Sequence, residues 1–478
     1  IFNMKYDLKT DIRNLSDNVM DGINEAFSLS EKHNKEILFS YTFRIDTDDL
    51  LPFVTHPSDR QHLRFYWQQA SKGISMAGLN SIWSRDYNNE KFHDQIKVDI
   101  EKIFSQSISI SDNILAGPRL IGGHAFSIDS KSDETWKNFP RSRFFLPECL
   151  ATLDDDGAWL TLSKFINSSM SIENFHDKLL QLCTHYQNRM PVTLPPVTQV
   201  NVDKFRDIPS KKDWNKTICS VLEEIRPGEI EKVVISRSHQ IKVSDKFSVS
   251  SALQILRNSY PSCTTFMFGF PNQGIFFGSS PERLIKMKND FIKTEALAGT
   301  QPRGENMEED RLLSETLFNS HKENEEHRFV VDQIKRNLDP IVKELNLSNN
   351  PEIMKLTNVQ HLKTPITGYL KKDGHILDLV KKLHPTPAIA GTPTDKAIKI
   401  IQEQEKTDRG WYSGPIGWFD QFGNGEFNVA LRSALIKKGV AYIFVGGGIV
   451  SESIPQKEWE ETELKLHPIL SALSGGQF

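Results

Sequence analysis

The chain has 478 residues, which is long enough to bury a large core and, on length alone, suggests two or three domains. The formal net charge is −4, and there is no basic block or basic stripe with interleaved aromatic residues, so nucleic-acid binding has no support. No apolar run reaches the ~18 residues that a membrane span needs, so no membrane partner is expected. These properties predict a soluble, cytoplasmic globular protein.

Cysteine usage agrees with a reducing compartment. Cys149, Cys183, Cys219 and Cys263 are scattered, without a C-x-x-C pair or a nearby histidine pattern. Neither a zinc site nor a disulfide framework is therefore predicted.

The first 200 residues carry few chemical signals. Alternating or β-branched stretches predict strands over 36–45 and 63–67, and apolar periodicity predicts a helix over 171–186. A Pro-rich and polar break at 190–213 is the predicted main boundary.

The remainder alternates strands and helices. Glycine and proline punctuation and apolar periodicity predict a strand over 231–238, a helix over 248–258 and a long helix over 307–338. A last helix is expected to begin near Pro455. Between these helices, three segments are expected to be strands of one antiparallel sheet: 414–420, 425–437 and 440–446.

Two acidic pairs are the most informative chemical feature. Glu323 with Glu326, and Glu458 with Glu461, are each spaced i,i+3, so on a helix both carboxylates of a pair lie on one face. A lone pair of this kind is usually a solvated acidic surface. Two such faces brought together would instead form an all-oxygen cage that suits a hard cation such as Mg2+.

Other segments carry polar or small residues, and each of these has both a structural and a functional interpretation. Lys232 lies on an apolar strand, where a lysine is usually exposed but, when half-buried, can act as a base. Glu282 follows a turn and could be a surface group. Arg432 lies in a strand that otherwise resembles core, where an inward arginine requires an anion. The small residues at 297–300 and 445–450 form tight turns or let backbone N–H groups approach a ligand carboxylate.

No Walker A, dinucleotide or Ser-His-Asp motif is present. The motifs above, in this order, resemble the chorismate-binding enzymes over about 205–470, and more loosely before residue 200 through Gly122-Gly123 and 143–147. The resemblance implies an α/β (α+β) fold of two large, mostly antiparallel sheets packed together, with helices outside and the site in a cleft. Residues 1–200 would form the N-terminal structural half of this shared sheet fold, and 205–470 the chorismate-binding catalytic region.

The resemblance also implies roles for single residues. Glu326 and Glu461 match direct Mg2+ ligands, with Glu323 and Glu458 acting nearby, often through water. Lys232 matches the general base and Glu282 the general acid. The positions that match substrate-binding groups for chorismate are Gly299, Thr300, His361, Ala388, Tyr412, Arg432, Gly447 and Lys465.

The chemistry implied is addition of water at ring C2 with loss of the C4 hydroxyl. Lys232 must then be neutral to accept a proton, and Glu282 must be protonated, so its pKa should be raised. Family members that use ammonia tend to carry Gln where this chain has Lys232, and members that also release pyruvate often carry Thr where this chain has Ala388. Lys232 thus favours an isochorismate or salicylate synthase over the amine-forming branch, and Ala388 favours the isochorismate synthase of these two.

The long N-terminal part resembles the menaquinone-type isochorismate synthase, whereas siderophore-type enzymes tend to be shorter there. Tyr412 weakens this assignment slightly, because some siderophore-type enzymes have Phe at that position. The alternatives left open are a salicylate synthase, an amine-forming chorismate enzyme and a binding module that keeps the fold without catalysis. A monomer or weak homodimer is expected.

Overall fold

The computed structural model describes residues 16–476 apart from 112, 114, 115, 131, 190–193, 195, 198–202, 226, 245, 246, 349 and 373. The predicted boundary at 190–213 therefore lies partly outside the described residues.

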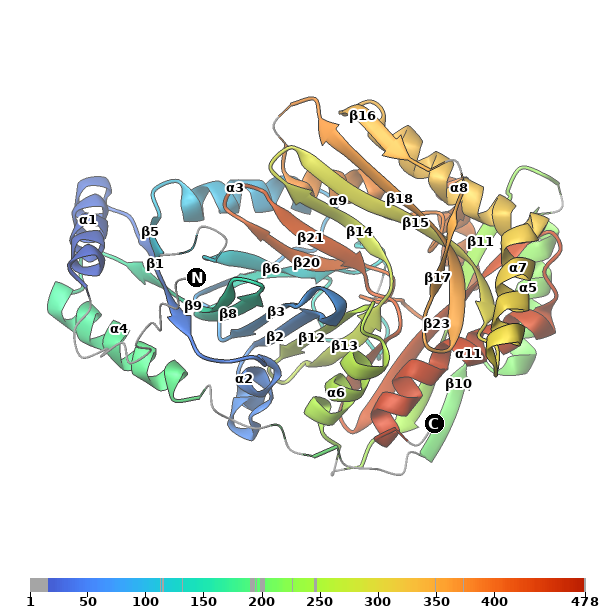
Figure 1. Cartoon of the computed structure of the whole chain (residues 1–478), viewed down its shortest axis with the longest axis horizontal. Helices are drawn as coiled ribbons and strands as arrows, with labels where there is room; N and C mark the ends of the chain where they lie inside the picture. Colours follow the sequence, from blue (N-terminus) through green and yellow to red (C-terminus); the bar gives the residue numbers. More distant parts are fainter. Residues whose placement is uncertain are drawn as a thin grey trace, which may run out of the picture.

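Helices surround the sheets (Figure 1). Their sequences explain their faces: in α5 the apolar residues Trp214, Ile218 and Val221 recur at helical spacing and are buried. No helix in the described ranges is long and apolar enough to cross a bilayer. The helices are α1 (Asp17–His33), α2 (Leu51–Thr55), η1 (Pro57–Gln61), η2 (Ala70–Lys72), α3 (Phe92–Phe104), α4 (Ile172–Gln187), α5 (Lys211–Ile225), α6 (Val249–Ser259), α7 (Met307–Asn319), α8 (His321–Leu338), α9 (Ile376–Leu383), α10 (Thr394–Gln404) and α11 (Pro455–Ser474).

A large sheet of 13 strands runs in the order β10-β11-β23-β22-β13-β12-β2-β3-β8-β9-β1-β5, with β19 paired to β11. In chain order its strands are β1 (Ile37–Ile45), β2 (Arg64–Gln69), β3 (Ile74–Leu79), β5 (Ile108–Ser111), β8 (Cys149–Asp154), β9 (Gly157–Ile166), β10 (Asp203–Ile208), β11 (Lys232–Lys242), β12 (Thr264–Phe270), β13 (Gly274–Ser280), β19 (Gly391–Thr392), β22 (Ser433–Lys437) and β23 (Val440–Val450).

A second sheet of 10 strands runs in the order β16-β18-β15-β14-β21-β20-β6-β7-β4, with β17 paired to β18. Its strands are β4 (Trp83–Asp86), β6 (Arg119–His124), β7 (Ser142–Leu146), β14 (Arg283–Lys288), β15 (Phe291–Pro302), β16 (Val342–Leu347), β17 (Glu352–Lys355), β18 (Val359–Leu370), β20 (Pro415–Asp420) and β21 (Gly425–Val429). Among the described ladders only β1 with β5 is parallel. The predicted fold class, two large mostly antiparallel sheets with helices outside, is confirmed.

Both sheets combine strands from the two ends of the chain. In the large sheet β12 pairs with β2, and in the second sheet β20 pairs with β6. Between the two sheets lies an aromatic core that includes Trp67, Phe145, Phe268 and Trp411. Burial of such large rings is the main apolar contribution that holds the two sheets together.

Two sequence predictions are wrong in detail. The single helix expected over 307–338 is two helices, because Ser320 is extended and its hydroxyl accepts a hydrogen bond from Glu323 N, which caps the start of α8. The segments at 414–446 do not form one sheet: β20 and β21 belong to the 10-stranded sheet, and β22 and β23 to the 13-stranded sheet. The chain crosses between sheets at Arg432, whose φ of 46° is left-handed.

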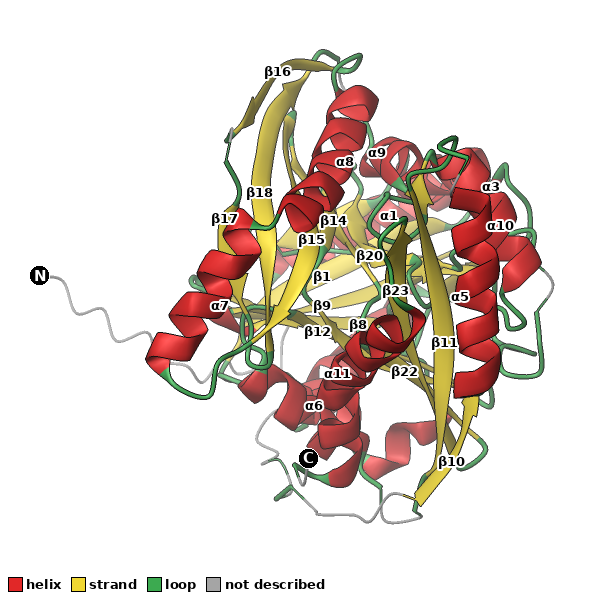
Figure 2. Cartoon of the chain, turned by 90° about the vertical axis from the view of Figure 1, so that its right-hand side faces the viewer, coloured by secondary structure: helices red, strands yellow, loops and turns green. Residues whose placement is uncertain are grey.

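The two helices that carry the acidic pairs lie near the point where the chain crosses between the sheets. Helix α8 packs on β15, and α11 packs on β23 (Figure 2). Strand β11 lies beside β23 and places Lys232 opposite Val450 and Ile235 opposite Gly447. Helix α11 therefore borders the strand that carries Gly447, and α8 reaches β11 through the ion pair of Glu326 with Lys232.

Candidate active site

A cavity of about 120 Å3 lies where the two sheets meet α8 and α11. Every predicted site residue except Gly447 and Glu458 lines it. The predicted residues on its wall are Lys232, Glu282, Gly299, Thr300, Glu323, Glu326, His361, Ala388, Tyr412, Arg432, Glu461 and Lys465. Strand alternation and helix periodicity thus bring together residues that are up to 233 positions apart (465 − 232).

The two remaining residues lie just behind the wall. Side chains along a strand alternate between faces, and in β23 it is Gly446 and Gly448 that line the cavity. A Cβ on Gly447 would point toward α11, 3.5 Å from Glu458 Oε2. Glu458 is buried and accepts a hydrogen bond of 2.7 Å from Ser453 Oγ.

Two lysines, one backbone N–H group and the Ser453 hydroxyl hold the four carboxylates. Glu326 pairs with Lys232 at 2.5 Å, and Glu461 pairs with Lys465 at 2.6 Å. Glu323 Oε2 accepts a hydrogen bond of 3.0 Å from the backbone N–H of Thr300. Burial, followed by the negative charge of Glu326, raises the pKa of Glu323 to about 7. Burial and the Glu326 charge therefore disfavour the ionised form of Glu323.

The donor set fits a hard cation. In the part of the chain that the structure describes, no three His, Cys, Asp or Glu side chains converge on one point as they stand, and two of the carboxylates are turned toward lysines. The cluster nevertheless offers only oxygen ligands, and the buried Glu458 Oε2 has no hydrogen-bond partner. Mutual repulsion and an unpaired buried oxygen are features that a bound divalent cation would relieve.

Glu282 has the property required of a proton donor. Its side chain is only 4% exposed. Burial, assisted by the charge of Glu295, raises the pKa of Glu282 to about 8, and Thr386 Oγ1 lies 3.5 Å from Glu282 Oε1. The direction agrees with the expectation from the sequence, and at neutral pH this carboxyl group is protonated.

On the cavity wall, the cationic Arg432 donates a hydrogen bond to the neutral His361. His361 Nδ1 lies 2.9 Å from the carbonyl oxygen of Gly299, so Nδ1 carries the proton, and Nε2 accepts from Arg432 Nη2 at 3.0 Å. Burial and the charge of Arg432 lower the pKa of His361 to about 3. His361 is therefore neutral, and Arg432, which has no carboxylate partner among the described residues, is available to an anion.

Sequence reasoning missed a buried ion pair beneath the cavity. Arg409 and Glu405 are both nearly inaccessible and pair at 2.6 Å. Arg409 donates to the carbonyl oxygens of Val234 and Ile389 at 2.7 Å each, and Glu405 accepts 2.7 Å from Ser236 N. The pair therefore connects β11, which carries Lys232, to the loop that carries Ala388, the residue expected to decide whether pyruvate is released. Its i,i+4 spacing was the available signal, but that spacing is typical of surface pairs.

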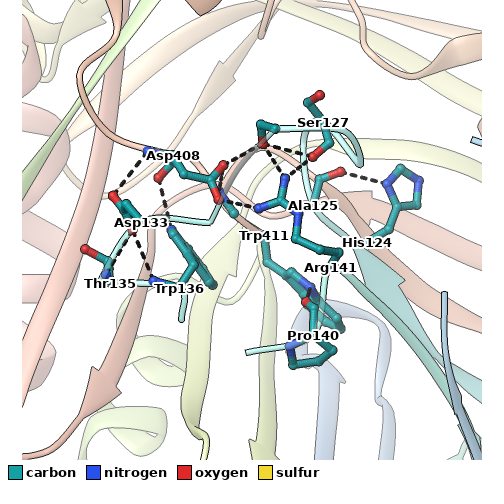
Figure 3. A network of polar contacts seen from close by, with 12 residues as sticks. His124, Ala125, Ser127, Asp133, Thr135, Trp136, Pro140, Arg141, Asp408 and Trp411 are labelled. Atoms are coloured by element: carbon teal, nitrogen blue, oxygen red, sulfur yellow. Dashed lines mark hydrogen bonds and ion pairs between the residues drawn. The ribbon is translucent and has the colours of Figure 1, made fainter. Parts of the chain in front are cut away.

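The N-terminal half supports the site through a polar network (Figure 3). Arg141 forms an ion pair with Asp408, and Trp411 Nε1 donates a hydrogen bond of 2.7 Å to the carbonyl oxygen of Pro140. This network fixes the segment that carries Tyr412, whose ring stacks on Phe444 with centroids 5.6 Å apart.

The comparisons with known proteins agree with this geometry. Residues 22–474 match the family model described as "Chorismate binding enzyme". The chain belongs to the chorismate-binding enzyme family. Its relatives include the isochorismate synthase MenF of Bacillus subtilis, which is 31% identical over 459 residues that cover 94% of this chain and 96% of that protein.

Two further members of this family are also similar over nearly the whole chain. The salicylate biosynthesis isochorismate synthase of Pseudomonas aeruginosa is 31% identical over 94% of this chain and 93% of its own length. The solved structure of MenF, the menaquinone-specific isochorismate synthase from Escherichia coli, superposes with a TM-score of 0.75 at 26% identity, covering 95% of this chain and all of that one.

Proposed function

We propose that this chorismate-binding enzyme is an isochorismate synthase, which converts chorismate to isochorismate by adding water at C2 and losing the C4 hydroxyl. The observation that carries the proposal is one cavity that holds both Lys232 and Glu282 beside the carboxylate cluster. The similarity to isochorismate synthases over nearly the whole chain supports it.

Each side chain has a role that its surroundings suit. Lys232 accepts a proton from the attacking water, and this requires the Glu326 carboxylate to turn away from the lysine. Glu282 gives its proton to the departing hydroxyl group, so one water enters and one leaves. Arg432, which has no carboxylate partner among the described residues, binds the enolpyruvyl carboxylate with the help of Tyr412. His361 faces the ring as a neutral donor–acceptor group.

The residues that would hold Mg2+ are Glu326 and Glu461, with Glu323 and Glu458 nearby. When bound, the cation supplies positive charge to the ring carboxylate of chorismate. Gly299, Thr300 and Lys465 lie on the cavity wall beside these carboxylates, and Gly447 lies behind it. We assign this catalytic part to 205–470, because every described residue of the wall falls between Lys232 and Lys465.

We propose menaquinone synthesis as the pathway, on the full-length similarity to MenF proteins. The Pseudomonas aeruginosa relative, named for salicylate biosynthesis, is covered equally well, so the discriminating experiment is genetic. Deletion of the gene should create a requirement for menaquinone. A requirement for salicylate or for added iron would instead assign the enzyme to the siderophore branch.

The biochemical test is an incubation of the pure protein with chorismate and Mg2+ in the absence of ammonia. Isochorismate, resolved by chromatography, is expected without release of pyruvate, because Ala388 stands where pyruvate-releasing relatives tend to carry Thr. Salicylate with pyruvate would assign the chain to the lyase branch. Turnover only after ammonia is added would show that Lys232 does not select water.

A further inference from the structure

A second cavity, of about 740 Å3, shares none of its described wall residues with the catalytic one. Its wall is formed by α2, the first turn of α6, and the β12–β13 and β22–β23 turns. Helices α2 and α6 lie against each other at this point (Figure 1). Among the described wall residues there is no Asp or Glu, whereas five carry basic side chains: His56, Arg60, Arg64, Lys437 and Lys438.

The central feature of this cavity is a buried arginine. Arg64, on β2, is only 4% exposed, and its Nε has no hydrogen-bond partner. No carboxylate among the described residues lies within ion-pair distance of it. Asp59, the acidic group whose charge acts on Arg64, is itself paired with Nη1 and Nη2 of Arg189. A buried guanidinium without a counter-ion is costly, so the site lacks an anion.

The surroundings leave space for this guanidinium and add positive potential. Arg64 lies opposite Gly269 in the β2–β12 ladder, and a Cβ on that glycine would come 3.3 Å from Arg64 Nε. Helix α6 begins at the same wall, with Ser248 as its N-cap. Ser248 Oγ accepts from Ser251 N at 3.5 Å, so the N–H groups of Val249 and Ser250 are those left without an intrahelical partner. The N-terminal end of this 11-residue helix favours negative charge.

The charge pattern distinguishes the kind of anion. The ammonium group of Lys437 is already bonded to the carbonyl oxygens of Thr135 and Lys137, so it does not contribute a free donor. Arg60, Arg64 and Lys438 still supply more than one positive charge, which suits a doubly charged group better than a single carboxylate. The wall also carries the apolar side chains of Leu194, Phe247, Ile275 and Ile436.

We propose that this cavity is a binding site for a phosphate monoester with an apolar body, in which Arg64 and the N-terminus of α6 hold the phosphate. The phosphate replaces the missing counter-ion of Arg64, and the apolar side chains of the wall cover the ester substituent. The site is separate from the catalytic cavity, so its occupation does not require chorismate.

The test uses the full-length protein with phenyl phosphate and inorganic phosphate, titrated by calorimetry and by 31P NMR at constant ionic strength. Saturable binding of phenyl phosphate is expected, tighter than that of inorganic phosphate. Arg64→Gln should weaken it about tenfold or more, because a charge-assisted hydrogen bond is lost. Lys438→Gln should weaken it less, and Lys288→Gln, an exposed charge in the other sheet, should leave it unchanged.

Two outcomes would overturn the proposal. One is equal affinity of wild type and Arg64→Gln, or no saturable binding to the wild type. The other is competition between phenyl phosphate and chorismate, which would place the ligand in the catalytic cavity. If Arg64→Gln does not fold, the double variant Arg60→Gln/Lys438→Gln decides in its place: undiminished affinity of that variant rejects the site, and weakened affinity supports it.

Discussion

Replacing Gly448 with alanine tests the placement of the proposed base directly. The new Cβ would lie 2.6 Å from Lys232 Cε, closer than real side chains tolerate, and a tight 3.2 Å from Lys232 Nζ. To restore an ordinary contact of 3.4 Å, Cε must withdraw by about 0.8 Å. The same methyl group would lie 3.3 Å from Glu326 Oε1, so the lysine and its partner are displaced together.

The expected loss follows from this displacement. A misplacement of about 1 Å at a reacting group can cost up to ~100-fold in rate, which corresponds to about 2.7 kcal/mol of activation free energy. The methyl group also overpacks a buried site, and we expect the free energy of unfolding to fall by about 1–3 kcal/mol. The measurements are kcat and KM for isochorismate formation, with stability from denaturant unfolding.

Gly117→Ala is the control. It adds the same methyl group at a loop position outside the site, where a new Cβ would meet no heavy atom within 4 Å. We expect its activity to stay within about twofold of wild type. Wild-type kcat for Gly448→Ala, or equal losses for both variants, would refute the assignment of Lys232 as a positioned base.

Four further outcomes are expected. Lys232→Gln should lower isochorismate formation by about 100-fold to 10,000-fold, measured by chromatography, and retained activity would exclude Lys232 as the base. Because Glu282 must donate a proton and its pKa is raised to about 8, kcat/KM should decline as pH rises through about 8; a flat profile to pH 10 would contradict this role. Burial lowers the pKa of His93 from 6.5 to about 4, so as pH falls the unfolded chain takes up a proton at this histidine before the folded chain does. The contribution of His93 to the free energy of unfolding should be fully present above pH 6.5 and fall by up to about 3 kcal/mol as pH drops through about 4. In acid unfolding experiments, His93→Phe should remove that part of the loss. Ala388→Thr should introduce some pyruvate release in a coupled assay, and its absence would show that this position alone does not control the lyase step.

Much of the local structure was predictable because its signals are local. Helix α11 begins at Pro455 as expected, since proline at the first helical position is a start signal, and the apolar run after Lys232 forms β11. The break at Ser320 was not predictable from periodicity. A local signal was nevertheless present, because Ser320 and Glu323 form the S-x-x-E pattern of a capping box, and the Ser320 hydroxyl caps α8.

At the site, the features that could not be predicted from the sequence depend on strand register and on packing. Which of Gly447 and Gly448 faces the cavity depends on a one-residue register, and glycine carries no polarity that reveals it. The pairing of Glu405 with Arg409 resembles a solvated helix pair in the sequence, and only the two packed sheets bury it. The site residues could be assigned to one site only through the resemblance to a family, because no sequence spacing relates them to one another.

The interleaving of both chain ends in each sheet has a consequence for how the polypeptide is made. Strands β2 and β6 leave the ribosome long before β12 and β20, their neighbours in the finished sheets. Until those partners arrive, the early strands present unpaired backbone edges, which are prone to associate with other chains. Pairing across such long sequence separations is also slow. Nascent chains of this protein thus depend on shielding of those edges, and catalytic competence is the last property the molecule acquires.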